Sequence, residues 1–333
     1  MKVGLSGEFR LLVTREDGSI KLDTGYNSNL ILDQGLDFFG LGGGQGDYLN
    51  QYCLIGAGNT APEASQTALD SVIKGVEYLT TSSDYTYTDE GDGLYKFWEE
   101  RKYRFEGLGD INISEVGLAS KYTSISNYYL TTRALIKDSE GLPTTISLKT
   151  GETLDVFYKI HKQYSTVDEV FQVNILDGEG GVEPFNVTVR PNAVGSSKGY
   201  NNNVSSYLGV NVDDTRNMGY LFADELEPIE ASSTDYSTHR ILAEKFKLST
   251  YVTGTFKRVL TIKVGIDDGN IPEGIRRFRY RTGGASFAKS PVPFMPLQLR
   301  FGSVADDSPI MKTDKESLDI PIEFSWGRVE EEV

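Results

Sequence analysis

The sequence is poor in the residues that most often carry chemistry. Its 333 residues include one cysteine, Cys53, and only two histidines, His161 and His239. One cysteine excludes an internal disulfide framework and a cysteine-rich zinc module, and two distant histidines argue against a transition-metal site. The chain also contains no Gly-x-Ser-x-Gly nucleophile turn. We therefore predict a protein that is not an enzyme and that holds no cofactor.

Long apolar runs and an excess of positive charge are also missing. The longest apolar stretches are only a few residues, so the sequence predicts no membrane span. Glu8 and Arg10 come too early for the apolar region of a signal peptide. The formal net charge is −15, which argues against binding to nucleic acid or to an anionic membrane. We expect a protein made in a cytosol and kept there or assembled there into something larger.

What the chain does contain favours strands. Apolar residues make up 38% of the sequence, enough to build a core, and this argues against global disorder. Glycine (35), tyrosine (19) and phenylalanine (16) are abundant, and this mixture is typical of strands joined by turns.

Short candidate strands separated by Gly, Asn and Asp turns predict an all-β fold. Residues 94–105 are the longest strand candidate, and Glu99 and Arg101 share one of its faces with aromatic residues. Residues 32–40 (LDQGLDFFG) predict a short helix, and residues 67–74 predict a second short helix or a turn. The other strand candidates are residues 9–14, 20–23, 130–136, 145–148, 154–161, 170–175, 185–189, 256–264, 276–280, 297–301 and 318–324.

A weak internal repeat suggests how the strands are organised. Four short segments recur in the same order about half a chain length later, and one example is residues 152–156 (ETLDV) and 316–320 (ESLDI). The other pairs are 63–65 with 230–232, 93–96 with 254–257, and 112–115 with 270–273. We predict two tandem antiparallel β-sandwich (jelly-roll-like) domains, 1–165 and 166–333, with one or two short helices. The second domain is then a diverged duplicate of the first. Two unrelated β regions that share turn chemistry remain the alternative.

Several motifs have a plain structural explanation beside a functional one. Residues 56–61 (GAGNTA) match a loose dinucleotide fingerprint, but Pro62 follows and no βαβ pattern surrounds them, so a turn at a strand end is favoured. Residues 89–92 and 267–270 are acidic turns that could offer oxygens to Ca²⁺, yet neither has the calcium-loop spacing. His161 lies in an alternating strand, which favours a solvated position over a catalytic one.

Exposed tyrosines and one loop are the candidate sites for a glycan. Tyrosines in strands are usually packed, but sugars also stack on exposed tyrosines. Residues 195–206 (GSSKGYNNNVSS) are the one stretch with the composition of a recognition loop, and a mobile loop explains them equally well. The candidate sugar-stacking residues are Tyr85, Tyr87, Tyr128, Tyr129, Tyr200 and Tyr207.

One series of segments runs in order along the chain, at residues 29–37, 52–62, 65–69, 113–118, 132–138, 151–156 and 325–328. Together these segments resemble virion structural proteins of tailed bacteriophages, associated with the tail or its appendages. The resemblance implies a sheath, collar, baseplate or appendage-attachment component that has no catalytic residues. Its partners would be other copies of itself and neighbouring tail proteins. Its location would be the tail of the virion, after assembly in the host cytoplasm.

Two function classes stay open. The first is an assembly protein of the tail, and the second is a host-recognition protein that binds surface glycan. An enzyme such as a capsule depolymerase is a more distant alternative. For assembly, residues 94–105 carry a candidate subunit contact made of Glu99, Glu100, Arg101 and Lys102. These charges could guard a sheet edge or match a neighbour, or they could be the solvated face of an interior strand.

Overall fold

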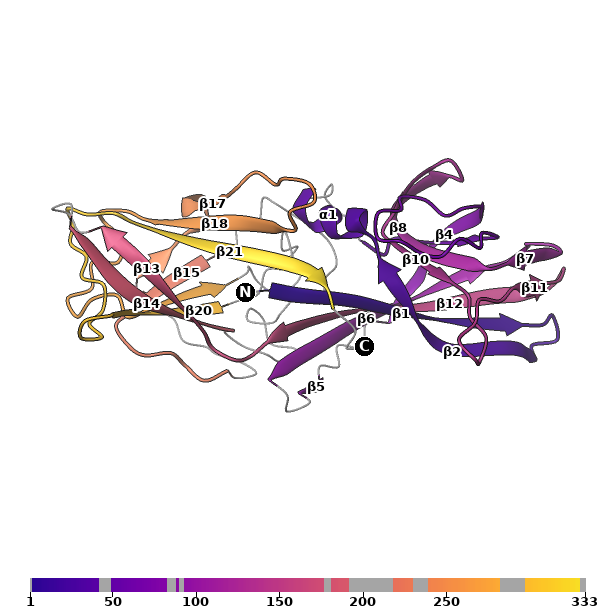
Figure 1. Cartoon of the computed structure of the whole chain (residues 1–333), viewed down its shortest axis with the longest axis horizontal. Helices are drawn as coiled ribbons and strands as arrows, with labels where there is room; N and C mark the ends of the chain where they lie inside the picture. Colours follow the sequence, from indigo (N-terminus) through magenta and orange to yellow (C-terminus); the bar gives the residue numbers. More distant parts are fainter. Residues whose placement is uncertain are drawn as a thin grey trace.

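The computed structural model describes residues 2–41, 49–82, 88–89, 93–176, 181–191, 218–229, 239–281 and 297–329, and every structural statement below concerns these residues. The fold is all-β, as predicted, and the molecule is elongated (Figure 1). The helix expected at residues 32–40 is present as α1 (Asp33–Leu41). Of the second short helix or turn expected at 67–74, the helix does not form: residues 67–71 are loop and bends, and β4 (Val72–Ser82), with its β-branched start, begins inside that segment.

Eight strands of the first half of the chain close into a barrel. Their order around the wall is β1-β2-β10-β8-β3-β4-β6-β12, and β12 pairs with β1 again, with every pair antiparallel. The predicted sandwich for residues 1–165 is therefore wrong in this detail, since β1 is paired along both edges and the sheet closes on itself. The strands are β1 (Lys2–Thr14), β2 (Ile20–Ile31), β3 (Tyr52–Gly56), β4, β6 (Leu94–Phe105), β8 (Glu115–Ser124), β10 (Thr132–Leu135) and β12 (Thr153–Ser165).

Alternation along the strands fills the interior of the barrel. In β1 every second side chain is buried, and Phe9, Leu11 and Val13 are fully enclosed. A hairpin joins β1 to β2, with Gly18 at a φ of 84° in the turn. Four short strands complete this half: β5 (Thr88–Asp89) pairs with β6, β9 (Asn127–Leu130) pairs with β8, and β7 (Ile111–Ile113) pairs with β11 (Ile146–Leu148) in a separate two-stranded sheet.

The second half of the chain builds two facing sheets. One is six-stranded, in the order β13-β14-β20-β19-β15-β16. Opposite lie β17, β18 and β21, and the Tyr280 ring is 6.3 Å from the Phe324 ring and 5.8 Å from the Phe246 ring across the gap (Figure 1). The strands are β13 (Glu169–Leu176), β14 (Val182–Pro191), β15 (Met218–Phe222), β16 (Arg240–Ile241), β17 (Phe246–Leu248), β18 (Lys257–Val264), β19 (Arg277–Arg281), β20 (Leu297–Ser303) and β21 (Leu318–Arg328), with a short 3₁₀ helix, η1 (Ala243–Lys245), before β17.

Strand β1 belongs to both halves. Its residues 2–5 pair in parallel with β21, while residues 7–14 pair with β2 on the same edge. One sheet therefore runs from the barrel into the second half, and one continuous cluster of buried apolar side chains fills both. The predicted boundary at 165/166 falls between β12 and β13, and the division into two domains stays a prediction.

Two of the four repeated segments occupy equivalent places. Residues 93–96 and 254–257 lead into β6 and β18, each next to a glycine with a φ near 80°. Glu152 accepts a hydrogen bond from the Lys149 N–H at 2.9 Å just before β12, and Glu316 accepts one from the Thr313 N–H at 2.9 Å just before β21. β6 pairs antiparallel with β12, and β18 with β21. Residues 230–232 lie outside the described part, and duplication of a whole domain stays a prediction.

Candidate functional site

Two residues of the predicted subunit contact point into the barrel. Arg101 Nε donates to Glu99 Oε1 at 2.8 Å, and both side chains are almost fully buried. Asn50 Nδ2 donates to the same carboxylate at 3.2 Å, and the Arg101 guanidinium lies 4.2 Å from the centre of the Tyr78 ring. Glu99 and Arg101 therefore stabilise the interior and lie away from the surface that a neighbour would touch.

The other two residues lie on the outer face of the same strand. The Tyr26 hydroxyl donates to Glu100, and Lys102 Nζ is 2.8 Å from Asp155 Oδ2. β6 pairs with β12 along its whole length and with β4 on its other side, so it is an interior strand and not a guarded edge. A subunit contact through Glu100 and Lys102 stays a prediction.

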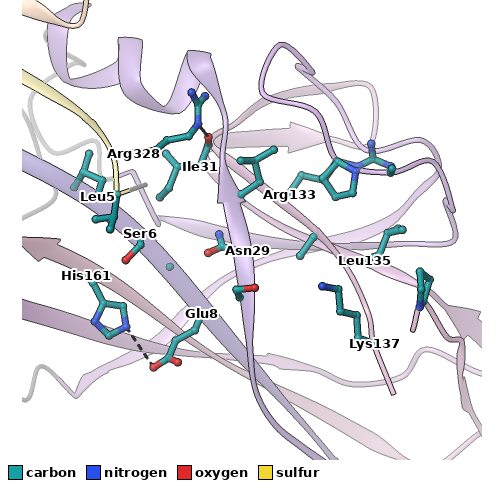
Figure 2. A pocket seen from close by; sticks show the side chains of 18 residues that line it. Leu5, Ser6, Glu8, Asn29, Ile31, Arg133, Leu135, Lys137, His161 and Arg328 are labelled. Carbon is teal, nitrogen blue, oxygen red and sulfur yellow. Dashed lines mark hydrogen bonds and ion pairs between the residues drawn. The ribbon is translucent and has the colours of Figure 1, made fainter. Parts of the chain in front are cut away.

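A groove of about 680 Å³ opens where β2 and β21 diverge from β1. Figure 2 shows His161 and Glu8 pointing toward one another at one end of it, with 3.3 Å between Nε2 and Oε1. Lys137 lines the other side. His161 is thus neither fully solvated nor alone, since its ring is partly covered and faces a carboxylate.

Two polar groups that line this groove are incompletely bonded. Arg133 is fully buried and binds Glu115 Oε2 through Nε and Nη2, but its buried Nη1 has no hydrogen-bond partner. Both amide atoms of Asn29 are buried and also lack a partner. These atoms are closed to solvent, so the polar groups that the groove presents to a ligand are those of Glu8, His161 and Lys137. The described residues give it no arrangement for a specific reaction.

The motif at residues 56–61 has a structural role. β3 ends at Gly56, no helix starts there, and Gly58 N–H donates to Glu115 Oε1 at 2.9 Å. A side chain at Gly56 or Gly58 would collide with the Glu115 carboxylate. The predicted turn at a strand end is confirmed, and these glycines make room for a buried acid.

The acidic turn at residues 267–270 has its oxygens engaged by lysines. Asp268 binds Lys245, and Asn270 Oδ1 accepts from Lys312 Nζ at 2.7 Å. Across the described ranges, no cluster of three or more His, Cys, Asp or Glu residues is arranged to hold a metal ion. Residues 90–92 of the other acidic turn lie outside these ranges.

The two describable tyrosines of the predicted sugar-stacking set are packed. Tyr129 donates its hydroxyl to the Gln34 carbonyl at 2.8 Å, and burial raises its pKa to about 12. The Tyr128 hydroxyl accepts from the Leu69 N–H at 3.2 Å. Tyr85, Tyr87, Tyr200, Tyr207 and residues 195–206 lie outside the described residues.

An open sheet edge is the feature that sequence analysis did not single out. β13 is the first strand of the six-stranded sheet and pairs only with β14 among the described strands. Val170, Phe171 and Leu176 are 62%, 50% and 74% exposed. From Val170 to Leu176 the strand contains no charged residue and no proline, the two devices that usually protect an edge. The uncharged run at residues 170–176 is the signal in the sequence that could have identified this edge strand.

The other strands at the ends of the sheets are much shorter. The opposite end of the same sheet is β16, with two residues, and the end of the larger sheet is β17, with three residues including Lys247. In the barrel, β2 pairs with β10 only at residues 30 and 31, so residues 20–29 also have no described partner on that side, but this stretch carries Lys21 and Asp23. With eight residues, β13 contains the longest uncharged edge that the described residues leave available for pairing.

Comparison of the chain with protein-family models, with curated proteins and with solved structures finds no match. Within the described residues, no helix has the length and apolar character needed to cross a membrane. The function must therefore be argued from the sequence and the structure of the chain itself.

Proposed function

We propose that this chain is a structural protein that assembles with copies of itself and with neighbouring proteins in the tail of a tailed bacteriophage. The observation that carries the proposal is the β13 edge, which exposes apolar side chains and backbone hydrogen-bonding groups together. Such edges pair readily with other strands, and proteins that must stay monomeric usually block them. The tail as the location follows from the resemblance of the sequence segments.

The continuity of the fold also supports a structural role. Strands β1 and β12 run beside one another for twelve paired residues, and β1 connects onward to β21. Since one sheet and one apolar core extend through both halves, a load on one half passes into the other through backbone hydrogen bonds. A component that holds others in place needs this property, whereas a catalyst does not.

Labelling of particles tests the proposal. Phage particles that carry an epitope tag on this chain, bound by gold-labelled antibody, should show gold on the tail in electron micrographs. Tagged chains that stay in the host lysate and are missing from purified particles would refute the structural role. Gold on the capsid would refute the tail location.

Binding of host-surface glycan is the second candidate, and the groove of Figure 2 favours it. The groove combines Glu8, His161 and Lys137 with the apolar surfaces of Pro62 and Pro143, a mixture typical of ligand sites. Glycan-array binding that is lost in Lys137→Ala and retained in Lys149→Ala, an exposed lysine away from the groove, would support this function. Absence of binding to host polysaccharide would eliminate it.

A further inference from the structure

We infer that β13 pairs antiparallel with β13 of a second copy of this chain, about a two-fold axis that passes beside Val173. This pairing rests on the proposed assembly function and names its partner and register. It joins the two six-stranded sheets into one continuous sheet of twelve strands.

The edge of β13 away from β14 can form further backbone hydrogen bonds. β14 covers one side of β13 over the full strand, from Glu169 opposite Val189 to Leu176 opposite Val182. On the other side, no strand of the described residues pairs with it. In an edge strand, alternate residues direct N–H and C=O groups outward, and a second strand satisfies them in register.

The sequence of the strand matches itself when reversed. With the axis at Val173, an antiparallel pair places Val170 opposite Leu176 and Phe171 opposite Ile175. Gln172 then lies opposite Asn174, so that amide meets amide, and Val173 meets its own copy. From Val170 to Leu176 every cross-strand neighbour is chemically compatible in this register. A shift of the axis by one residue, to Gln172, would instead place Val170 opposite Asn174.

The core face of the sheet also continues across the axis. Phe171 and Val173 lie opposite Val187 and Phe185 of β14, whose side chains are buried in the core. Phe171 and Val173 therefore lie on the core-facing side, but they are 50% and 39% exposed. A second copy would place its Ile175 beside Phe171 and extend the apolar layer, which removes exposed apolar surface from water.

The distribution of charge favours β13 as the surface of contact between identical chains. Each copy carries a net charge of −15, so most faces of two copies repel each other. The run from Val170 to Leu176 carries no charge. Two copies paired along β13 therefore bring carboxylates opposite one another only at the two ends of this run, where Glu169 of one copy meets the position of Asp177 in the other. The β17 edge would instead place Lys247 of one copy close to that of the other in the centre of an equivalent pairing.

Paired cysteine variants of the full chain test the register. The single native cysteine, Cys53, is buried and does not compete. Mixed Val170→Cys and Leu176→Cys chains should form a disulfide-linked dimer under mild oxidation, since the two Cβ atoms face each other at about 5 Å. Either variant alone should not, because its two copies place the cysteines about 20 Å apart. The mixture should therefore crosslink at least about tenfold more than either variant alone.

Charge insertion provides the matched control. Val170 and Val252 are both 62% exposed, and Val252 lies in a turn away from β13. Val170→Lys should raise the dimer dissociation constant by about tenfold or more, while Val252→Lys should leave it unchanged, as measured by light scattering on a size-exclusion column. Thermal melting of both variants checks that they fold.

Three outcomes overturn the inference. They are a monomeric wild-type chain at high concentration, a dimer that Val170→Lys leaves intact, and crosslinking of the single variants that equals that of the mixture. Gold-labelled chains on the tail together with any of these outcomes would leave the proposed function standing and remove only the β13 pairing. Absence of the chain from particles together with specific crosslinking of the mixed variants would refute the proposed function and leave the β13 pairing standing.

Discussion

The two halves of the molecule bury arginine side chains in opposite ways. In the barrel, Arg133 Nη2 lies 2.9 Å from Glu115 Oε2, and neither side chain has any exposed surface, while the partly exposed Asp70 is a second partner at 2.8 Å. In the six-stranded sheet, Arg277 is equally buried, but its 2.7 Å partner, Asp224, is 65% exposed. Arg277 also lies over the Phe222 ring, 3.9 Å from its centre.

The two pairs differ in whether the carboxylate loses its hydration on folding. Glu115 gives up all its water and regains hydrogen bonds from Arg133 and from the backbone N–H groups of Gly58 and Ser71. It thereby ties the loop over residues 57–71 to the barrel wall. Asp224 keeps most of its hydration, so its ion pair with Arg277 contributes little free energy, and removing Asp224 should cost little stability. A buried pair is thus costly to break, whereas a half-exposed pair is not.

Breaking the buried pair should have the largest effect on stability. Arg133→Met leaves the Glu115 carboxylate buried without a cation, and we expect the free energy of unfolding to fall by about 3 to 5 kcal/mol. Urea denaturation followed by tryptophan fluorescence measures this change.

A double variant separates the charge from the packing. Arg133→Met combined with Glu115→Leu removes both charges and should recover a substantial part of the loss. If the double variant is as unstable as the sum of the two single variants, the two residues do not act as a pair, and the contrast between the halves disappears.

The positions of the strands were predictable because they depend on local pattern. Alternation placed β6 at residues 94–105, and the helix at 32–40 followed from its apolar spacing. Closure of the barrel was not predictable, because it depends on pairing Val3 with Tyr164, residues far apart in the sequence. Local pattern gives the faces of a strand, but it does not say which strands become neighbours.

The same limit applied to the candidate site. Glu99 and Arg101 were correctly placed on one face of their strand, but both faces mix aromatic and charged residues, so the pattern could not show which face is inside. The Asn50 side chain that binds Glu99 comes from a distant segment. The β13 edge was overlooked for another reason: it is recognised by the absence of charge and of a second partner strand, and only the first is visible in a sequence.

A buried lysine in the barrel sharpens the comparison. Lys162 is buried near the Glu99–Arg101 pair, and loss of water lowers its pKa to about 8, against 10.5 for an exposed lysine. Between these values the unfolded chain binds more protons than the folded one, so stability should rise with pH. From pH 7.5 to 9.5 we expect a gain of about 2 kcal/mol in the wild type relative to Lys162→Met.

Urea denaturation at several pH values in this window measures the difference. Lys162→Met keeps the volume and removes the titrating group, so its curve reports all other groups. Parallel curves for the two proteins would mean that Lys162 keeps an ordinary pKa in the folded state. The Arg133–Glu115 pair would then be the one case in this comparison of a charge whose burial in the barrel affects stability.

Removing the exposed acid of the sheet should have the smallest effect. Asp224→Ala takes one partner from Arg277, but Glu227 Oε2 remains 3.5 Å from Arg277 Nη1, and the Phe222 ring still covers the guanidinium. We expect a loss of about 1 kcal/mol that shrinks as salt is added, because exposed pairs are weak and screened.

Glu140→Ala, an exposed acid in a turn, should change stability by less than about 0.5 kcal/mol and serves as the matched control. A loss for Asp224→Ala as large as that for Arg133→Met would show that exposure of the acid does not decide the cost. The opposite result, the small and salt-sensitive loss, would confirm that burial of both partners is what makes the barrel pair hard to break.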